Sequence, residues 1–144
     1  MDNKEFVIRE NNGKKEIFDA IRKKYVVLTP EELVRQSFIS FLINKKKYPK
    51  SHIAVEKEIK VNKLSKRFDI AIFNNLAKPV MIIECKAPVV KITQDVFDQI
   101  ARYNMFFKVS HLVVTNGIET YCCHIDFKTS QYHFIEELPD YNFL

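Results

Sequence analysis

The stretch Arg67 to Pro88, RFDIAIFNNLAKPVMIIECKAP, contains two short apolar runs joined by a turn. The runs FDIAIF and PVMIIEC are rich in β-branched and aromatic residues and are bounded by Asn, Lys and Pro, which predicts two strands of a well-covered sheet. Three charged residues interrupt the runs: Asp69, Glu84 and Lys86. An isolated buried charge is costly, so these three residues need a physical explanation.

The two runs are predicted to form a hairpin that brings two carboxylates together. We expect Phe73 and Val80 to close it around the loop NNLAKP. Counting back along both strands then places Asp69 opposite Glu84, with their Cβ atoms about 5 Å apart. Side chains alternate along a strand, so Lys86 shares the face of Glu84. Two carboxylates at this distance repel each other unless a proton, a base or a metal compensates.

A divalent cation is one solution to this repulsion. Mg²⁺ prefers hard oxygen ligands and keeps several waters, so one or two carboxylates plus substrate phosphate oxygens make a usual site. The ammonium of Lys86 then orients or deprotonates an attacking water and holds a phosphate. The alternative is an ordinary buried pair of Lys86 and Glu84, with Asp69 at a strand end. Spacing alone does not separate the two interpretations.

The order of Asp69, fourteen residues and then Glu84-Cys85-Lys86 resembles the D...ExK core of the PD-(D/E)XK nuclease superfamily. Four blocks, TPEELVRQ, ECKAP, DQIARYN and LVVTNG, resemble in the same order the N-terminal nuclease domain of type I restriction enzyme R subunits and their stand-alone relatives. The resemblance runs from about Phe18 to Tyr121. ExK alone is a weak signal, whereas four blocks in order are specific. Phe68 stands where the motif often has a proline, which contributes no ligand.

The resemblance implies a metal-dependent nuclease site. Asp69 and Glu84 would bind Mg²⁺, for which Mn²⁺ can substitute, and the Cys85 carbonyl would add a ligand. Lys86 would position the attacking water. The bound metal would lower the pKa of that water and stabilise charge on the phosphate.

Two helices are expected to support this site. Thr29 caps the first, through about Lys45, and Glu32, with Glu31 as alternate, is the candidate for the glutamate that often completes the metal site in similar nucleases. Both acids also favour a helix N-terminus through its dipole. On the second helix, Gln99 and Tyr103 match the family's QxxxY element beside the catalytic centre. The alternative is Tyr103 as a core residue.

The second helix is predicted from a cap at Thr93 to about Lys108. Its apolar stripe is expected at Val96, Ile100, Tyr103 and Phe107. On the first helix the corresponding stripe is expected at Val34, Phe38, Phe41 and Leu42.

The composition limits the possible classes of protein. At 144 residues, 47% of them hydrophobic, the chain is predicted to form one domain with its own core. Only Gly13 and Gly117 are glycines, and no GxxxxGK[ST] motif occurs, so neither a nucleotide cofactor nor the motor of restriction subunits is expected. No signal sequence or membrane-spanning run is present, which favours a cytoplasmic protein.

Cysteine and histidine suggest no further site. The three cysteines include a vicinal pair and lack CxxC spacing, so we expect reduced thiols. In one register of the C-terminal hairpin, His124 faces His133 with Cys122 nearby. We disfavour a zinc cluster there, because structural zinc sites normally have four ligands at tighter spacing.

The net charge of +5 is compatible with a polyanionic partner, and DNA is the one expected. The predicted basic rim consists of Lys45, Lys46, Lys47 and Lys50, which precede the strand expected from His52 to Val61. The basic run Arg22 to Lys24 is interpreted as a solvated edge rather than as a DNA contact. Glu56 is within reach of the site, but an exposed polar face explains it more simply.

The sequence therefore predicts an α/β domain with a restriction-endonuclease-like αβββαβ core, a mixed central sheet flanked by helices, and extra hairpins at both ends. Residues 1–28 form an N-terminal hairpin extension that extends or caps the sheet, 29–116 the core, and 117–144 the C-terminal hairpin. The expected function is Mg²⁺-dependent DNA phosphodiester hydrolysis, as an endonuclease rather than an exonuclease. The alternatives are a non-catalytic nucleic-acid or protein-binding module, and a subunit active only in a larger nuclease complex.

Overall fold

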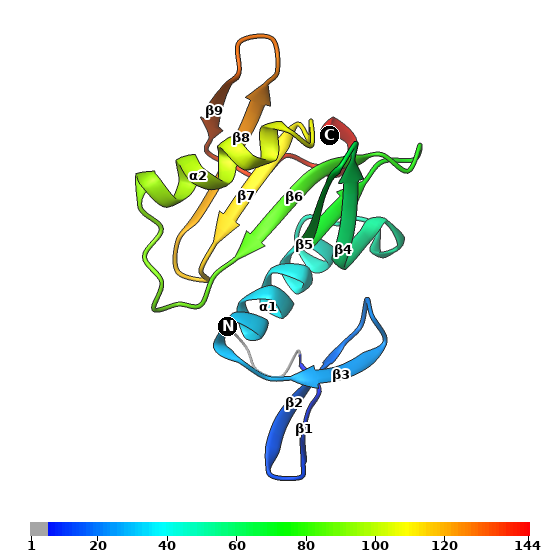
Figure 1. The fold of residues 1–144 in the computed structure, drawn as a ribbon. Helices are drawn as coiled ribbons and strands as arrows, with labels where there is room; N and C mark the ends of the chain where they lie inside the picture. The colour runs from blue at the N-terminus through cyan, green and yellow to red at the C-terminus, as the bar shows by residue number, and fades with distance from the viewer. Residues whose placement is uncertain (1–5) are drawn as a thin grey trace.

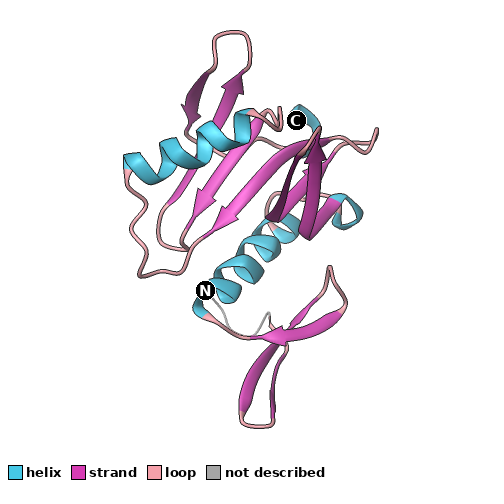
Figure 2. Cartoon of the chain, viewed as in Figure 1, coloured by secondary structure: helices cyan, strands magenta, loops and turns pink. Residues whose placement is uncertain are grey.

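A computed structural model describes residues 6–144 as a six-stranded mixed sheet with one helix on each face, and a separate three-stranded sheet at the N-terminal end (Figure 1). Figure 2 distinguishes helices from strands in the same view. The elements in chain order are β1 (Ile8–Asn11), β2 (Lys14–Asp19), β3 (Lys24–Val27), α1 (Pro30–Asn44), η2 (Lys50–His52), β4 (Ile53–Val61), β5 (Leu64–Phe73), β6 (Pro79–Cys85), α2 (Gln94–Met105), β7 (His111–Thr115), β8 (Thr120–Asp126), β9 (Gln131–Ile135) and η3 (Tyr141–Phe143).

The large sheet has the order β4-β5-β6-β7-β8-β9. Its first three strands are antiparallel, β6 and β7 are parallel, and α2 supplies the crossover between them. The predicted restriction-endonuclease-like order αβββαβ is therefore confirmed as α1-β4-β5-β6-α2-β7. The C-terminal hairpin of β8 and β9 continues this sheet.

The predicted hairpin register between β5 and β6 is present. Ile70 pairs with Ile83 and Ile72 with Met81, which is the alignment that brings Asp69 to the level of Glu84. At the loop end the register shifts between Ile72 and Phe73, so that Phe73 pairs with Pro79 and not with Val80. A proline has no N–H for the ladder and is tolerated at the first residue of a strand.

The N-terminal hairpin forms as predicted, but it does not extend the central sheet. Asn12 and Gly13 both have positive φ, at 51° and 79°, as a tight two-residue turn requires. β2 also pairs with β3, so the segment makes its own three-stranded sheet. Of the two arrangements left open, extension of the central sheet is wrong, because β1 and β2 form a separate sheet with β3, which was not predicted as a strand.

The first helix begins as predicted. The Thr29 hydroxyl accepts the N–H of Glu32 at 3.0 Å, and Pro30 occupies the first turn. Along α1 the buried residues include Val34, Phe38 and Leu42. Phe41 was expected in the same stripe, but it is 40% exposed because it lies at the edge of the contact with the sheet.

The second helix is shorter than predicted and is rotated. Thr93 caps α2, but the helix ends at Met105 and not near Lys108. Its buried face carries Phe97 and Ala101, so the predicted stripe was offset by about one residue. Tyr103 is 40% exposed as a result.

Two hydrophobic clusters fill the two sides of the large sheet. Under α1, Leu42 and Ile39 pack with Ile70 and Ile83, and under α2, Phe97 packs with residues of the other face. None of the helices among residues 6–144 has the length and hydrophobicity that a membrane-spanning helix needs.

Candidate active site

Asp69 lies where the β5–β6 ladder stops. The last pair of that ladder is Ile70 with Ile83, and the next backbone N–H of β6 that turns toward β5, that of Cys85, donates to Asp69 Oδ2 at 2.8 Å. A side-chain carboxylate therefore replaces a main-chain acceptor. The Asp69 side chain is 19% exposed, so it is partly desolvated but reachable from solvent.

The backbone is irregular at the same level. Glu56 of β4 stands between the pairs Val55–Ile70 and Lys57–Phe68, which places it opposite Asp69, and its φ is +57°. A non-glycine residue at positive φ costs roughly 1–3 kcal/mol and such strain concentrates at functional sites. Phe68 and Ile70 belong to different clusters although residues two apart on a flat strand share a face. The strand is therefore twisted at Asp69.

Glu84 is a buried carboxylate, at 8% exposed. Burial raises the pKa of Glu84, the nearby Asp69 carboxylate raises it further, and an ammonium opposes both effects. That ammonium belongs to Lys66, whose Nζ donates to Glu84 Oε1 at 2.9 Å. Asp69 and Glu84 are thus close enough to interact, as the predicted register requires.

Lys66 is held between two aromatic rings. Its Nζ lies 5.0 Å from the ring centroid of Phe68 and 4.8 Å from that of Tyr103. Aromatic faces attract cations at such distances. Tyr103 is thereby connected to Glu84 through Lys66. This gives Tyr103 of the QxxxY element a position at the edge of the site.

Arg35 connects α1 to the other carboxylate. It donates to both oxygens of Glu32 at 2.7 and 2.8 Å and to Glu56 at 2.5 Å, and its Nη1 lies 3.5 Å from Asp69 Oδ1. Burial acts to raise the pKa of Glu32. Hydrogen bonds from Arg35 and Gln36 and the positive charges of Arg35 and Arg22 outweigh this effect and hold the pKa below its usual value. Glu32 therefore reaches Asp69 through Arg35.

The ionic network continues into the N-terminal sheet. Arg22 donates to Asp19 at 2.6 Å and to Glu32 at 3.0 Å, and Asp19 is fully buried. The interpretation of the Arg22 to Lys24 run as a solvated edge is therefore wrong for Arg22, because two carboxylates draw its guanidinium inward. The network joins the end of β2 to the N-terminal turn of α1.

The remaining predicted site residues do not join the ionic network within residues 6–144. Lys86 follows β6, and its backbone N–H donates to Thr115 O at 2.8 Å. Across residues 6–144 its ammonium has no ion pair, so it is available to a ligand. Gln99 is exposed on α2, where it lines a shallow hollow with Tyr103. Glu31 is exposed at the start of α1.

Three residues of the site were missed or set aside from the sequence. The sequence does contain an indication for Lys66, since alternation along the strand places it on the same face as Phe68. Arg35 also has one, since it stands three residues after Glu32 on a helix and lies within the TPEELVRQ block. Glu56 was noted as within reach and then explained as exposed. Nothing in its sequence predicts the positive φ that turns it toward Arg35.

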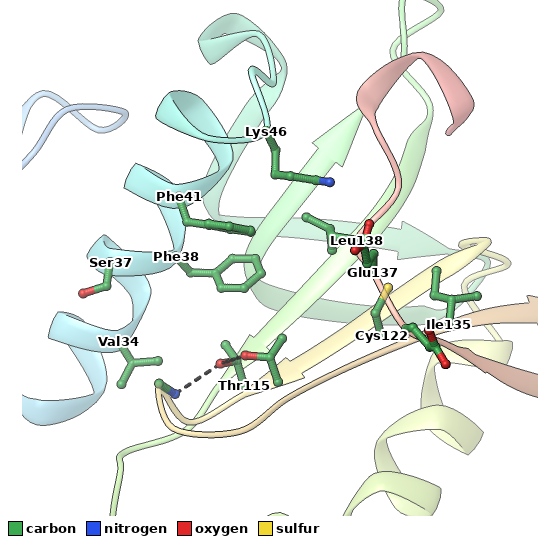
Figure 3. A pocket seen from close by; sticks show the side chains of 13 residues that line it. Val34, Ser37, Phe38, Phe41, Lys46, Thr115, Cys122, Ile135, Glu137 and Leu138 are labelled. Carbon is green, nitrogen blue, oxygen red and sulfur yellow. Dashed lines mark hydrogen bonds between the residues drawn. The ribbon is translucent and has the colours of Figure 1, made fainter. Parts of the chain in front are cut away.

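The predicted basic rim lies away from the carboxylates. Lys45 to Lys50 follow the C-terminal end of α1, about 20 Å along the helix from Glu32. Lys46 is 3.5 Å from Asp140 and lines a cavity of about 590 Å³ between α1 and the C-terminal strands (Figure 3). That cavity is mainly apolar, with Phe38 among its lining residues, and neither Asp69 nor Glu84 reaches it.

The histidine and cysteine residues do not assemble into a metal site in the described part of the chain. His124 pairs with His133 between β8 and β9, as in the register considered above. Nevertheless, residues 6–144 contain no group of three His, Cys, Asp or Glu side chains that could hold a metal ion. The three cysteines are free and buried. A site at Asp69 and Glu84 would therefore rely on two carboxylates, with waters and substrate completing it.

The fold and the paired carboxylates at its central strands define a restriction-endonuclease-like domain. The family model described as type I restriction enzyme R protein N terminus matches residues 30–139, and the chain belongs to this family. No curated protein matches the chain. Family membership indicates a restriction-type nuclease domain, for which DNA is the implied substrate.

Proposed function

We propose that this domain hydrolyses DNA phosphodiester bonds in a Mg²⁺-dependent reaction, as an endonuclease, at Asp69 and Glu84. The observation that carries the proposal is the meeting of these two partly buried carboxylates at the end of the β5–β6 ladder. Two adjacent carboxylates in a partly desolvated position are unfavourable without compensating positive charge. Lys66 and Arg35 supply part of that charge in the structure, and a divalent cation that also binds a phosphodiester would supply more.

The donor set fits Mg²⁺. Asp69 and Glu84 supply hard carboxylate oxygens, and the Cys85 carbonyl is the further candidate ligand. When bound, the metal ion supplies Lewis-acid stabilisation of phosphate charge and a more acidic water. Mn²⁺ is the expected substitute. The Cys85 N–H holds one Asp69 oxygen at 2.8 Å, so the carboxylate is oriented before any ligand arrives.

The other residues have separate roles. Lys86, which follows Glu84 by two residues and has no ion pair within residues 6–144, orients the attacking water and contacts the phosphate. Arg35 holds Asp69 in place, and Glu32 acts through Arg35 as a positioning residue. Tyr103 and Gln99 form the wall of the site on the side of α2.

The DNA backbone approaches the β4–β5 hairpin in this proposal, beside Lys66. The exposed cations of the hairpin are Lys57, Lys60, Lys63 and Arg67. They lie on β4, on β5 and in the turn between these strands, and Glu58 is the exposed acid among them. The rim from Lys45 to Lys50, proposed from the sequence, is the competing surface, and its distance from Glu32 counts against direct contact with the scissile phosphate.

A cleavage assay tests the proposed reaction. The protein should nick supercoiled plasmid DNA with Mg²⁺ or Mn²⁺ and should lose this activity with EDTA. Lys86→Ala and Glu84→Gln should each lower the rate by at least about a hundredfold, the scale of one general acid–base group. Lys78→Ala, in the exposed loop before β6, is the matched lysine control and should cleave like the parent.

Two outcomes would contradict the proposal. Cleavage by Lys86→Ala at the parental rate would make Lys86 a structural residue. DNA binding by the parent without any metal-dependent cleavage would favour the non-catalytic module, in which Lys66 and Arg35 permanently neutralise the carboxylates. Cleavage only after addition of further subunits would assign the domain to a larger nuclease complex.

A further inference from the structure

Each of the two candidate carboxylates already has a cation of the protein beside it. Lys66 Nζ is 2.9 Å from Glu84, and Arg35 Nη1 is 3.5 Å from Asp69. The two cations differ in how firmly they are held. Arg35 makes further hydrogen bonds to Glu32 and Glu56, so its position does not depend on Asp69.

Lys66 has one carboxylate partner, Glu84, among the described residues. Its other contacts are the faces of Phe68 and Tyr103, which attract a cation without fixing its direction. Lys66 is also more exposed than Arg35, with side-chain exposures of 26% and 11%. The ammonium can therefore leave Glu84 while its apolar stem stays against the two rings.

A divalent cation on Glu84 would stand within contact distance of this ammonium. The positive charges of the metal ion and the ammonium would repel each other strongly at such a distance, because the site is partly desolvated. The metal and the Lys66 ammonium therefore compete for Glu84. Phe68 is fully buried, whereas Tyr103 is 40% exposed, so the displaced ammonium and a phosphate can meet on the Tyr103 side.

We propose that Lys66 is a positioning residue that neutralises Glu84 in the metal-free protein, is displaced when a divalent cation takes this carboxylate, and then faces the phosphate of the substrate. The inference rests on the proposed metal site at Asp69 and Glu84. It adds that metal binding regulates the site, because binding of the metal ion also moves a second lysine toward the substrate.

Calorimetric titration with Mn²⁺, without DNA, tests the competition. Lys66→Met keeps the apolar stem and removes the charge, so Mn²⁺ should bind at least tenfold more tightly than in the parent. Lys66→Arg should bind like the parent. Lys78→Met is the matched control, because Lys78 is an exposed lysine in the loop between β5 and β6, and it should leave the affinity unchanged. Unchanged or weaker binding by Lys66→Met would overturn the inference.

A second measurement uses the unmodified chain and avoids any variant that fails to fold. The lysine ammonium resonances are followed by NMR while Mg²⁺ is added. The Lys66 signal should change as the site fills, with loss of its hydrogen bond to Glu84, and an unchanged signal at saturation would overturn the inference. Neither measurement involves cleavage. Metal-coupled release of Lys66 in a protein that cuts no DNA would therefore refute the proposed reaction and leave the inference standing.

Discussion

Asp69 accepts the backbone N–H of Cys85 at 2.8 Å, so one carboxylate both ends a strand ladder and faces the candidate site. The two roles can be separated by mutation. The amide oxygen of Asn can accept the same N–H but has no negative charge for a metal ion. The methyl group of Ala can neither accept the N–H nor bind a metal ion.

Asp69→Asn should therefore keep the stability of the parent within about 0.5 kcal/mol and lose binding of divalent cations. Asp69→Ala should also lose binding and, in addition, about 1–3 kcal/mol of stability, because the Cys85 N–H loses its acceptor. Urea unfolding and Mn²⁺ titration of the two variants check this. Equal stabilities for both variants would show that the hydrogen bond is not maintained in solution.

Arg35 is expected to be the residue on which the ionic network most depends. Arg35→Met leaves Glu32 and Glu56 without their main partner, and removing one member of a buried ion pair costs about 3–5 kcal/mol. Arg9→Met is the control, because Arg9 is 48% exposed and its pair with Glu16 is worth at most about 1 kcal/mol. Similar unfolding midpoints for the two variants would contradict the network.

The buried His111 should make the protein sensitive to mild acid. Burial lowers the pKa of His111 below 6.5, and the neighbouring His124, whose ring is 5.1 Å away, adds to this. Just below pH 6.5 this histidine therefore binds a proton in the unfolded chain but not in the folded chain. The contribution of neutral His111 to stability is complete above pH 6.5 and is lost as the pH falls below it. The expected slope is at most about 1.4 kcal/mol per pH unit.

Unfolding measured between pH 7.5 and about pH 5 checks the effect of His111. The variant His111→Gln should show a smaller loss of stability in this window than the parent, because it has no group to titrate. His133→Gln, at an exposed position of β9, should retain the parental slope. A parental slope in His111→Gln would assign the acid sensitivity to other groups.

DNA affinity measured from low to high salt distinguishes the two basic surfaces. Each phosphate neutralised contributes close to one unit to the slope of log affinity against log salt. Changing Lys60 and Lys63 to Glu should weaken binding of all sequences alike and flatten this slope by about two units. The same change at Lys46 and Lys47 should have little effect if DNA lies at the hairpin, and the opposite pattern would place it on the rim.

Local patterns were enough to predict much of the fold and the central pair of carboxylates. Alternation along the strands fixed the register of Asp69 and Glu84, and the caps Thr29 and Thr93 fixed where the helices begin. These predictions succeeded because each depends on residues close together in the chain. The face of α2 was predicted wrongly because aromatic residues on two sides of the helix fit the same spacing, and Phe97 rather than Tyr103 is buried.

The partners of the carboxylates could not be predicted in the same way. Lys66 of β5 reaches Glu84 of β6, and Arg35 of α1 meets Glu56, a residue with a positive φ on β4. Both contacts depend on long side chains from separate elements and on a backbone irregularity. A spacing rule gives Lys86 as the lysine on the face of Glu84, and tertiary structure adds Lys66.

The central claim is that a divalent cation binds between Asp69 and Glu84, and anomalous scattering from crystals soaked in Mn²⁺ tests it most directly. The account predicts one strong peak within coordinating distance of both carboxylates, with Lys66 Nζ moved away from its 2.9 Å contact with Glu84. Saturating Mn²⁺ that gives no peak at these residues, or a peak elsewhere with the Lys66–Glu84 pair intact, would contradict it.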